Sequence, residues 1–389
     1  MNPNFRESMR LKQVQSPIIP IVGDLITSNP GTISLGQGVV YYDPPPQIQQ
    51  GLIRFAESSG NHRYQEVEGL AELRQVIAQK VESDNNINAE NFEVVVTAGS
   101  NMGFLNAVLA ITDPGDEIIL TSPCYFNHEM AVQIAGCNAV LVQTEEDYLP
   151  NIESLEAAIT PRTRAIVSIS PNNPTGVVYP QKLLVSINKL CEIKDIFHIS
   201  DEAYEYFIYD GKTHFSPASQ EDSQQHTISL FSLSKSFSMA SWRIGYMLIP
   251  KQLMSAVKKI QDTNLICPVV ISQYAAIEAL KIGSSYISDE VKALERVRAT
   301  LLEGISQLDN VKLSRPGGAF YAFLELPECS LDDMAITRQL IEEYGVAVIP
   351  GSAFKMQDSC YIRVSYGALH PSQSKKGIQR LLEGLNLIA

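Results

Sequence analysis

The sequence lacks the features that mark membrane, secreted and nucleic-acid-binding proteins. No run of about 18 apolar residues occurs in the 389 residues, so a membrane-spanning helix is not expected. Charges and prolines are scattered over the first 25 residues, where a signal peptide needs an unbroken apolar stretch. The net charge is -13, and no basic tail or stripe is present to meet phosphates. We therefore expect neither a membrane nor a nucleic acid as a partner.

Cysteine is scarce and never occurs as a C-x-x-C pair. The six cysteines stand far apart, at Cys124, Cys137, Cys191, Cys267, Cys329 and Cys360. This spacing is typical of isolated thiols in a reducing compartment and not of a zinc site or a disulfide framework. The six histidines show no pairing that indicates a metal. We expect a cytoplasmic protein without a metal site, and we interpret its histidines as structural.

Short apolar runs alternate with longer helical patterns through the middle of the chain. Strands are predicted at residues 92–98, 116–122, 138–144, 163–170, 197–200, 227–233 and 244–249. Helical patterns such as 101–111 and 180–194 lie between them. This alternation predicts the α/β class, with a mainly parallel sheet sandwiched by helices.

The pattern changes near residue 276. A long helical segment, 289–308, is followed by strand-like stretches that surround another helix. Those stretches are residues 311–326, 346–354 and 360–367. We predict a large domain of residues 46–275 and a smaller α+β domain formed by residues 1–45 and 276–389.

Polar and aromatic residues follow five of the predicted strands. These residues are Gly99, Ser100 and Asn101, then Tyr125, then Asn173, then Asp201 and Tyr204, and finally Ser234 and Lys235. Ligands bind beyond the carboxyl ends of strands in open parallel sheets, so we expect these side chains to meet at one edge. Taken singly, each has a common structural explanation, such as a solvated lysine or a helix cap.

Together, these residue types suit one ligand. A lysine with a lowered pKa forms a Schiff base with an aldehyde, and Arg243 could both lower that pKa and hold a phosphate. The Gly-Ser-Asn turn at a helix start offers further phosphate donors. A carboxylate such as Asp201 keeps a pyridine nitrogen protonated, and Tyr125 could stack on the ring. Asn173 and Tyr204 could bind a phenolic oxygen. Aldehyde, phosphate, pyridine and phenol describe pyridoxal 5'-phosphate.

The chain resembles the class I/II aminotransferases of fold type I, the aspartate aminotransferase superfamily. The resemblance runs from "ISLGQG" near residue 33 to "IRVSYG" near residue 362. The stretch "SLSKSFSMASWRIGY" matches the family's S-x-x-K motif with an arginine eight positions on. It implies Lys235 as the lysine bound to the cofactor, with Ser232 and Arg243 on its phosphate.

Two further motifs carry the resemblance. The stretch "PNNPTG" resembles the N-P-T-G motif and implies Asn173 on the cofactor's 3'-oxygen. The stretch "SDEAYEYFIY" resembles D-x-A-Y and implies Asp201 on the pyridine nitrogen and Tyr204 on the 3'-oxygen.

The remaining site residues also follow from the resemblance. "VTAGSNMGF" looks like the phosphate loop, which implies cofactor contacts from Gly99, Ser100 and Asn101, and Tyr125 stands where the family places its ring-stacking aromatic. Tyr64 is similar to the tyrosine that reaches the partner subunit's phosphate, which implies a homodimer. Arg363 resembles the clamp for the substrate α-carboxylate, and Gly38 would add a backbone donor to it.

The resemblance implies transfer of an amino group from an L-amino acid to a 2-oxo acid, with Lys235 as general base and then acid. After "LGQG" this chain departs from the P-D-F-like stretch of many relatives and reads "VVYYDPPP". Tyr41 and Tyr42 are therefore expected to make the substrate pocket more aromatic, which favours aromatic or bulky neutral amino acids. A lyase or synthase of the same fold, such as a carbon–sulfur β-lyase or an aminocyclopropane carboxylate synthase, stays open as the alternative.

Overall fold

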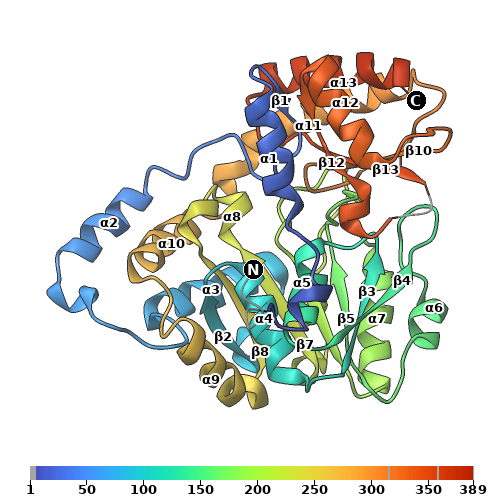
Figure 1. Cartoon of the computed structure of the whole chain (residues 1–389). Coiled ribbons are helices and arrows are strands. Elements are labelled where there is room, and N and C mark those ends of the chain that lie inside the picture. The colour runs from blue at the N-terminus through green and yellow to red at the C-terminus, as the bar shows by residue number, and fades with distance from the viewer. Residues whose placement is uncertain (1–5, 314–315, 357–358, 389) are drawn as a thin grey trace.

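A seven-stranded sheet forms the centre of the larger part of the molecule (Figure 1). The computed structural model describes residues 6–313, 316–356 and 359–388. The strand order is β2-β8-β7-β6-β5-β3-β4. The strands are β2 (Phe92–Thr97), β3 (Glu117–Ser122), β4 (Asn138–Gln143), β5 (Thr163–Ile169), β6 (Phe197–Asp201), β7 (Thr227–Ser232) and β8 (Gly245–Pro250). Only β8 runs antiparallel to its neighbours, so the predicted, mainly parallel sheet is confirmed.

Helices cover both faces of this sheet because its strands are apolar on both sides. Along β2, Val94 and Val96 pack in a core with α3 and α10, whereas Val95 between them packs in the opposite core with α4 and α9. The helices around this sheet are α2 (Ile48–Ala56), α3 (Ala71–Asn85), α4 (Ser100–Ile111), α5 (Phe126–Ile134), α6 (Ile152–Ala157), α7 (Gln181–Ile193), α8 (Leu233–Ser236), α9 (Met254–Asn264) and α10 (Val270–Ile282). Continuous Val and Ile runs are typical of such doubly covered strands.

A second, smaller group of elements lies above the large sheet in Figure 1. A four-stranded sheet has the order β12-β13-β10-β9, and β1 pairs with β11. The elements of this smaller group are α1 (Ile18–Ser28), β1 (Ile33–Ser34), α11 (Ser288–Ile305), β9 (Lys312–Leu313), β10 (Tyr321–Leu326), α12 (Asp333–Tyr344), β11 (Val346–Ala347), β12 (Ile349–Pro350), β13 (Cys360–Ser365) and α13 (Pro371–Ile388). The predicted boundary after residue 275 falls inside α10. Residues 1–5, 314–315, 357–358 and 389 of the predicted small domain lie outside the described residues. The division into 46–275 against 1–45 and 276–389 stays a prediction.

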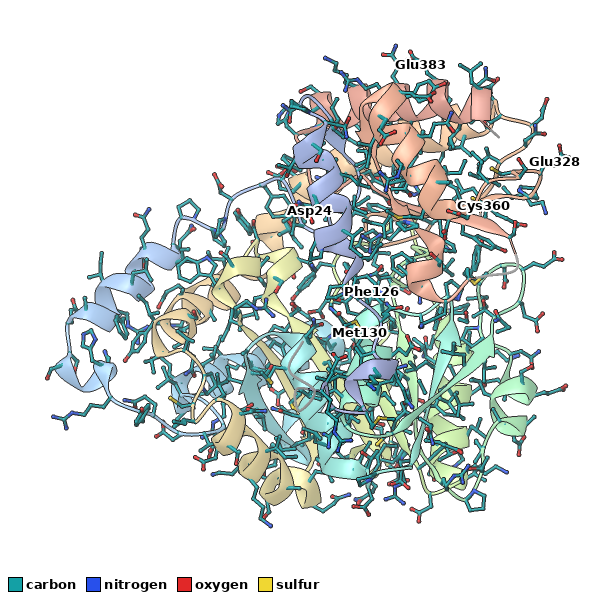
Figure 2. The ribbon with its side chains drawn as sticks, in the orientation of Figure 1. Asp24, Phe126, Met130, Glu328, Cys360 and Glu383 are labelled. Carbon is teal, nitrogen blue, oxygen red and sulfur yellow. The ribbon has the colours of Figure 1, made fainter. Side chains whose placement is uncertain are left out.

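The two groups meet through an apolar cluster next to the large sheet. Phe126 at the start of α5 packs with Phe323 of β10 and with Phe354, and Val22 of α1 joins them. Figure 2 labels Phe126 and Met130 below α1, at the height where the upper and lower groups adjoin. No helix in the described ranges combines the length and the apolar character needed to cross a membrane.

Candidate active site

A cavity of about 270 Å³ lies beyond the carboxyl ends of β5, β6 and β7. It is lined by Ser100, Asn101, Tyr125, Ile169, Asn173, Asp201, Ala203, Tyr204, Ser232, Ser234, Lys235 and Arg243. All the residues predicted from the strand ends and motifs line it except Gly38, Tyr64, Gly99 and Arg363. The parallel strands thus bring to one place residues that are more than a hundred positions apart in sequence.

Lys235 stands on α8, a helix of one turn that follows β7 directly. The Ser232 hydroxyl accepts a hydrogen bond from the backbone N–H of Ser234 at 3.1 Å and so caps this turn. The Lys235 amine donates to the carbonyl of Gly38 at 2.5 Å. Burial lowers the pKa of Lys235 to about 8, assisted by the positive charges of Arg363 and then Arg243, while Asp201 acts in the opposite direction. A lysine with this pKa supplies a neutral amine close to pH 8.

Gly99 and Arg243 shape one end of the cavity. Gly99 has φ +79°, and a Cβ there would lie 2.5 Å from Nη2 of Arg243, so only glycine fits. Arg243 donates to the carbonyls of Ala240 (2.8 Å) and Ala98 (3.2 Å) and remains exposed. The guanidinium therefore lies beside the N-terminus of α4, where backbone N–H groups and the helix dipole also favour an anion.

Asp201 closes the end of β6 and is buried. Its Oδ1 accepts from the backbone N–H of Ala203 at 3.1 Å, and its Oδ2 pairs with Nε2 of His128 at 3.1 Å. The His128 ring stacks on Phe104 with 3.9 Å between centroids and meets the edge of Tyr125. The structural interpretation of the histidines missed this contact, because nothing in the sequence links α5 to the end of β6.

Arg363, Asn173 and two tyrosines form a connected group. Arg363 is 2% exposed and donates to Asn173 Oδ1 (3.0 Å) and to the carbonyl of Gly36 (2.6 Å). The Asn173 amide donates to the Tyr204 hydroxyl at 3.4 Å, which is itself 2.8 Å from the hydroxyl of Tyr321. Tyr321 was not predicted, since β10 carries no motif that marks it. Nε of Arg363 has no hydrogen-bond partner within the described ranges, so it can still serve a carboxylate.

The other predicted residues are placed as follows. Tyr125 is partly buried at the cavity that Asp201 also lines, and burial raises its pKa. Tyr64 is 78% exposed and does not line this cavity. Tyr42 is buried with its hydroxyl on the Lys235 backbone, and the hydroxyl of Tyr41 bonds Glu290. Neither ring lines this cavity, which also leaves out Gly38 and Arg363, so their place in the substrate pocket stays a prediction.

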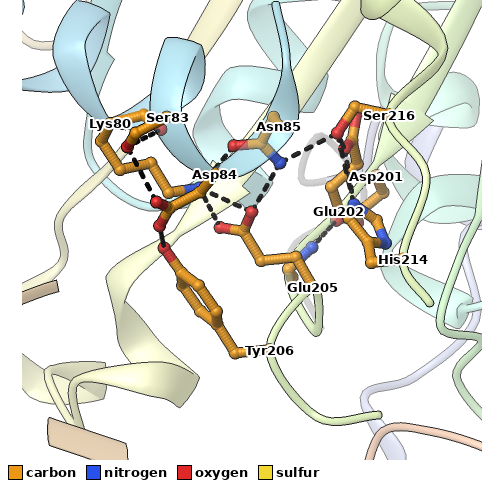
Figure 3. Close-up of polar contacts among 11 residues, drawn as sticks. Lys80, Ser83, Asp84, Asn85, Asp201, Glu202, Glu205, Tyr206, His214 and Ser216 are labelled. Atoms are coloured by element: carbon orange, nitrogen blue, oxygen red, sulfur yellow. Dashed lines mark hydrogen bonds and ion pairs between the residues drawn. The ribbon is translucent and has the colours of Figure 1, made fainter. Parts of the chain in front are cut away.

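A buried polar network backs the cavity-lining turn after β6 (Figure 3). Lys80 of α3 bonds both carboxylate oxygens of Glu205 at 2.5 Å and the Asn85 side chain at 2.9 Å. Asn85 also donates to the Ser216 hydroxyl, which donates to Glu202 at 2.5 Å. Asp201 and Tyr204 therefore face the cavity while Glu202 and Glu205, in the same turn, are anchored on its far side.

The residues present fit pyridoxal 5'-phosphate. The cavity offers an amine with a lowered pKa, a buried carboxylate, a phenol with an amide beside it, and a guanidinium at a helix N-terminus. Because Gly99 has no side chain, the Arg243 guanidinium can approach the start of α4, and Nε of Arg363 has no partner among the described residues, so two cationic groups can receive an anion. These groups can bind an aldehyde, a pyridine nitrogen, a phenolic oxygen, a phosphate and a carboxylate.

This chain is similar to known aminotransferases in both sequence and structure. A family model described as aminotransferase class I and II matches residues 30–381. An aromatic aminotransferase of Arabidopsis thaliana is 33% identical over 97% of this chain and 96% of its own length, and an aspartate/prephenate aminotransferase of Thermus thermophilus is 35% identical over 90% and 89%. The crystal structure of an aromatic aminotransferase from Pyrococcus horikoshii superposes with a TM-score of 0.86 at 33% identity, covering 93% of this chain and 98% of that one.

The sheet and the lysine-centred cavity thus define a cofactor-dependent transferase of the type I fold. The chain belongs to the class I and II aminotransferase family.

Proposed function

We propose that this enzyme uses pyridoxal 5'-phosphate, held by the predicted residues, to transfer amino groups from L-amino acids with aromatic or bulky neutral side chains to 2-oxo acids. The observation that carries the proposal is the Lys235 amine. It lies in a cavity together with Asp201, and its pKa is lowered to about 8. An amine of this kind can bind an aldehyde and then exchange protons near neutral pH.

The proposal gives each of these residues a role. When bound, the cofactor withdraws electrons from the amino acid and so acidifies its Cα–H bond. Lys235 would remove that proton and return one, Asp201 would hold the proton of the pyridine nitrogen, and Arg363 would bind the α-carboxylate through its Nε, which has no partner among the described residues. The groups assigned to holding the cofactor are Gly99, Ser100, Asn101, Tyr125, Asn173, Tyr204, Ser232 and Arg243.

The preference for aromatic donors rests on the names of relatives. The Arabidopsis and Pyrococcus horikoshii proteins are named aromatic aminotransferases, and the Thermus thermophilus protein is named for aspartate and prephenate. A lyase or synthase is not favoured, because these relatives are all named aminotransferases.

A donor panel tests the proposal. The purified protein, loaded with pyridoxal 5'-phosphate, is mixed with phenylalanine, tyrosine, tryptophan, methionine or aspartate without an acceptor, and the loss of the visible absorbance is followed. Aromatic donors should react fastest, and a 2-oxo acid should restore the absorbance. Faster reaction with aspartate contradicts the donor preference, and release of pyruvate and ammonia without an acceptor indicates a lyase. A visible band retained in Lys235→Ala overturns the assignment of the lysine.

We further infer a homodimer in which Tyr64 reaches the partner's site. Tyr64 is exposed on the outside of the molecule after α2, and Ile53 (61% exposed) and Val269 (48%) lie on or next to the adjoining helices α2 and α10 (Figure 1). Arg243 is also exposed at the cavity, where a partner could cover it. Mixing inactive Lys235→Ala with weakened Tyr64→Ala should regain activity through hybrid dimers, whereas no regain with dimers present contradicts the shared site.

The cellular location is a separate inference. All six cysteines are free, and four of them are buried. Isolated thiols suit a reducing compartment, which supports a cytoplasmic enzyme. Fractionation of cells that express the tagged chain tests this.

A further inference from the structure

We propose that Tyr42 is a positioning residue for Lys235, acting as one end of a backbone segment, residues 36–42, that holds the lysine at both of its ends. The inference rests on the proposed function only in that Lys235 is taken as the reacting amine. Nothing in the four matched motifs assigns a role to Tyr42, which stands where the chain departs from the family pattern.

Tyr42 holds the backbone of the lysine. Its hydroxyl is 3.2 Å from the carbonyl oxygens of both Lys235 and Ser236 and donates to them. In return, the Ser238 hydroxyl donates to the carbonyl of Tyr42 at 2.5 Å. These contacts hold the C-terminal half of the short turn α8 and the residues just after it, and the four residues of α8 make few helical hydrogen bonds of their own.

The Tyr42 side chain is itself fixed. It is 7% exposed, and its ring meets the rings of Tyr41 and Tyr286 edge to face, with 5.7 Å and 6.2 Å between centroids. Burial, together with the nearby Tyr286 and Glu290, raises the pKa of Tyr42 far above its ordinary range. The hydroxyl therefore keeps its proton at neutral pH and can donate to the carbonyls.

Gly38, four residues earlier, holds the other end of the lysine. Its carbonyl accepts the Lys235 amine at 2.5 Å. A lysine side chain has a flexible four-carbon stem, so fixing only its backbone or only its amine leaves many rotamers open. Fixing both ends selects the few rotamers that place the amine in the cavity, which is the kind of orientation that accelerates a proton transfer.

The same segment reaches the proposed carboxylate clamp. The carbonyl of Gly36 accepts from Arg363 at 2.6 Å, and the carbonyl of Gln37 accepts from the Ser365 hydroxyl at 2.7 Å. Three successive carbonyls thus contact β13 twice and then Lys235. The amine and the clamp are positioned against one continuous stretch of backbone. Because Tyr42 itself bonds only the lysine turn, whereas Gly36 and Gln37 contact β13, removing the Tyr42 hydroxyl should affect the lysine and leave the clamp in place.

Tyr42→Phe and Tyr41→Phe form a matched pair for the test. Each removes one hydroxyl from neighbouring rings, but that of Tyr41 bonds Glu290 and not the lysine segment. In the cofactor-free protein, Lys235 is labelled with formaldehyde and cyanoborohydride over a pH series and quantified by peptide mass spectrometry. We expect the labelling midpoint, near pH 8 in the parent, to rise in Tyr42→Phe and to stay unchanged in Tyr41→Phe.

Activity of the loaded enzyme gives the second readout. Losing one neutral hydrogen bond should lower kcat by about three- to tenfold in Tyr42→Phe and change the KM of the donor by less than about twofold. An unchanged midpoint together with an unchanged kcat overturns the proposal. If Tyr42→Phe does not fold, Ser238→Ala should give a smaller change of the same sign, and no change there overturns it equally. A parent protein that labels near pH 8 but reacts with no donor contradicts the proposed function and not the role of Tyr42.

Discussion

Lys80 is buried and Lys235 is partly buried, and these two lysines differ in their partners. Lys80 is 6% exposed and forms an ion pair with Glu205 at 2.5 Å, with the Asn85 side chain as a further acceptor and the rings of Tyr206 and Phe231 about 5 Å away (Figure 3). Lys235 is partly buried and bonds a neutral carbonyl, that of Gly38. Burial, assisted by the guanidinium groups of Arg363 and Arg243, lowers its pKa.

The comparison shows that burial alone does not mark a reactive lysine. A buried carboxylate partner fixes Lys80 as part of the framework, since removing either charge would leave the other unpaired in a low dielectric. Lys235 has a neutral carbonyl as its partner, and burial together with its positive neighbours lowers its pKa, which favours the neutral amine. One turn, the residues after β6, connects the two lysines. Glu205 in this turn bonds Lys80, whereas Asp201 and Tyr204 line the cavity that contains Lys235.

Replacing each lysine by arginine should lower kcat far more at Lys235 than at Lys80. A guanidinium stays charged at all accessible pH values and cannot form an imine or accept the substrate proton. We expect Lys235→Arg to lower kcat by about 10³-fold or more while the unfolding temperature hardly moves. Steady-state kinetics and calorimetry measure both, with Lys80→Arg as the control that keeps its ion pair and most of its activity. Transamination by Lys235→Arg within tenfold of the parent would refute the assignment.

Lys80→Met should show the opposite pattern. It leaves the Glu205 carboxylate buried without its cation, which costs about 3–5 kcal/mol of the free energy of unfolding, while kcat of the folded enzyme falls by less than about tenfold. Urea unfolding followed by circular dichroism measures the loss. The double variant Lys80→Met with Glu205→Leu should recover most of it, because the unpaired charge is gone. A double variant no more stable than the single one would show that the ion pair is not the cause.

The fold was predictable because strands that are buried on both faces appear in the sequence as continuous apolar runs. Each of the seven predicted strands is present with its ends within one residue, from the Val-rich β2 to β8. The antiparallel placement of β8 between β2 and β7 was not predicted, since strand order depends on how long connections pack and not on any local pattern.

The cavity was predictable for a related reason. Residues directly after parallel strands meet at one edge, so Asn173, Asp201 and Lys235 could be placed together without knowing the packing. The contacts of His128 with Asp201 and of Tyr321 with Tyr204 could not be predicted. The first joins helix α5 to the end of β6, and the second joins β10 of the smaller sheet to the turn after β6, so both depend on packing between distant segments. Lys80 and Glu205 are 125 residues apart, and a lysine in an amphipathic helical pattern gives no sign that it will be buried.

The pH dependence of Lys235 labelling should distinguish this lysine from an ordinary exposed one. Below its pKa of about 8 the amine is protonated and inert, so labelling of the cofactor-free protein should rise through pH 8, well before that of an ordinary exposed lysine. Arg363→Gln should move this midpoint up more than Arg243→Gln, because Arg363 is the stronger of the two positive neighbours and Arg243 is exposed to solvent. Asp201→Asn should move it down. The opposite order for the two arginine variants would place the main charge effect elsewhere.

Ser216→Ala should give the smallest effect and test whether the back of the turn matters for chemistry. The buried Ser216 hydroxyl joins Asn85 to Glu202, so its loss leaves polar groups unsatisfied at a cost of about 1–3 kcal/mol. We expect kcat to change by less than about twofold, since Glu205 still anchors the turn that carries Asp201. Ser28→Ala, which removes an exposed hydroxyl at the end of α1, is the matched control and should be neutral. A loss of kcat in Ser216→Ala comparable to that in Lys235→Arg would mean that the network takes part in the reaction, because a framework contact has no other route to so large a change.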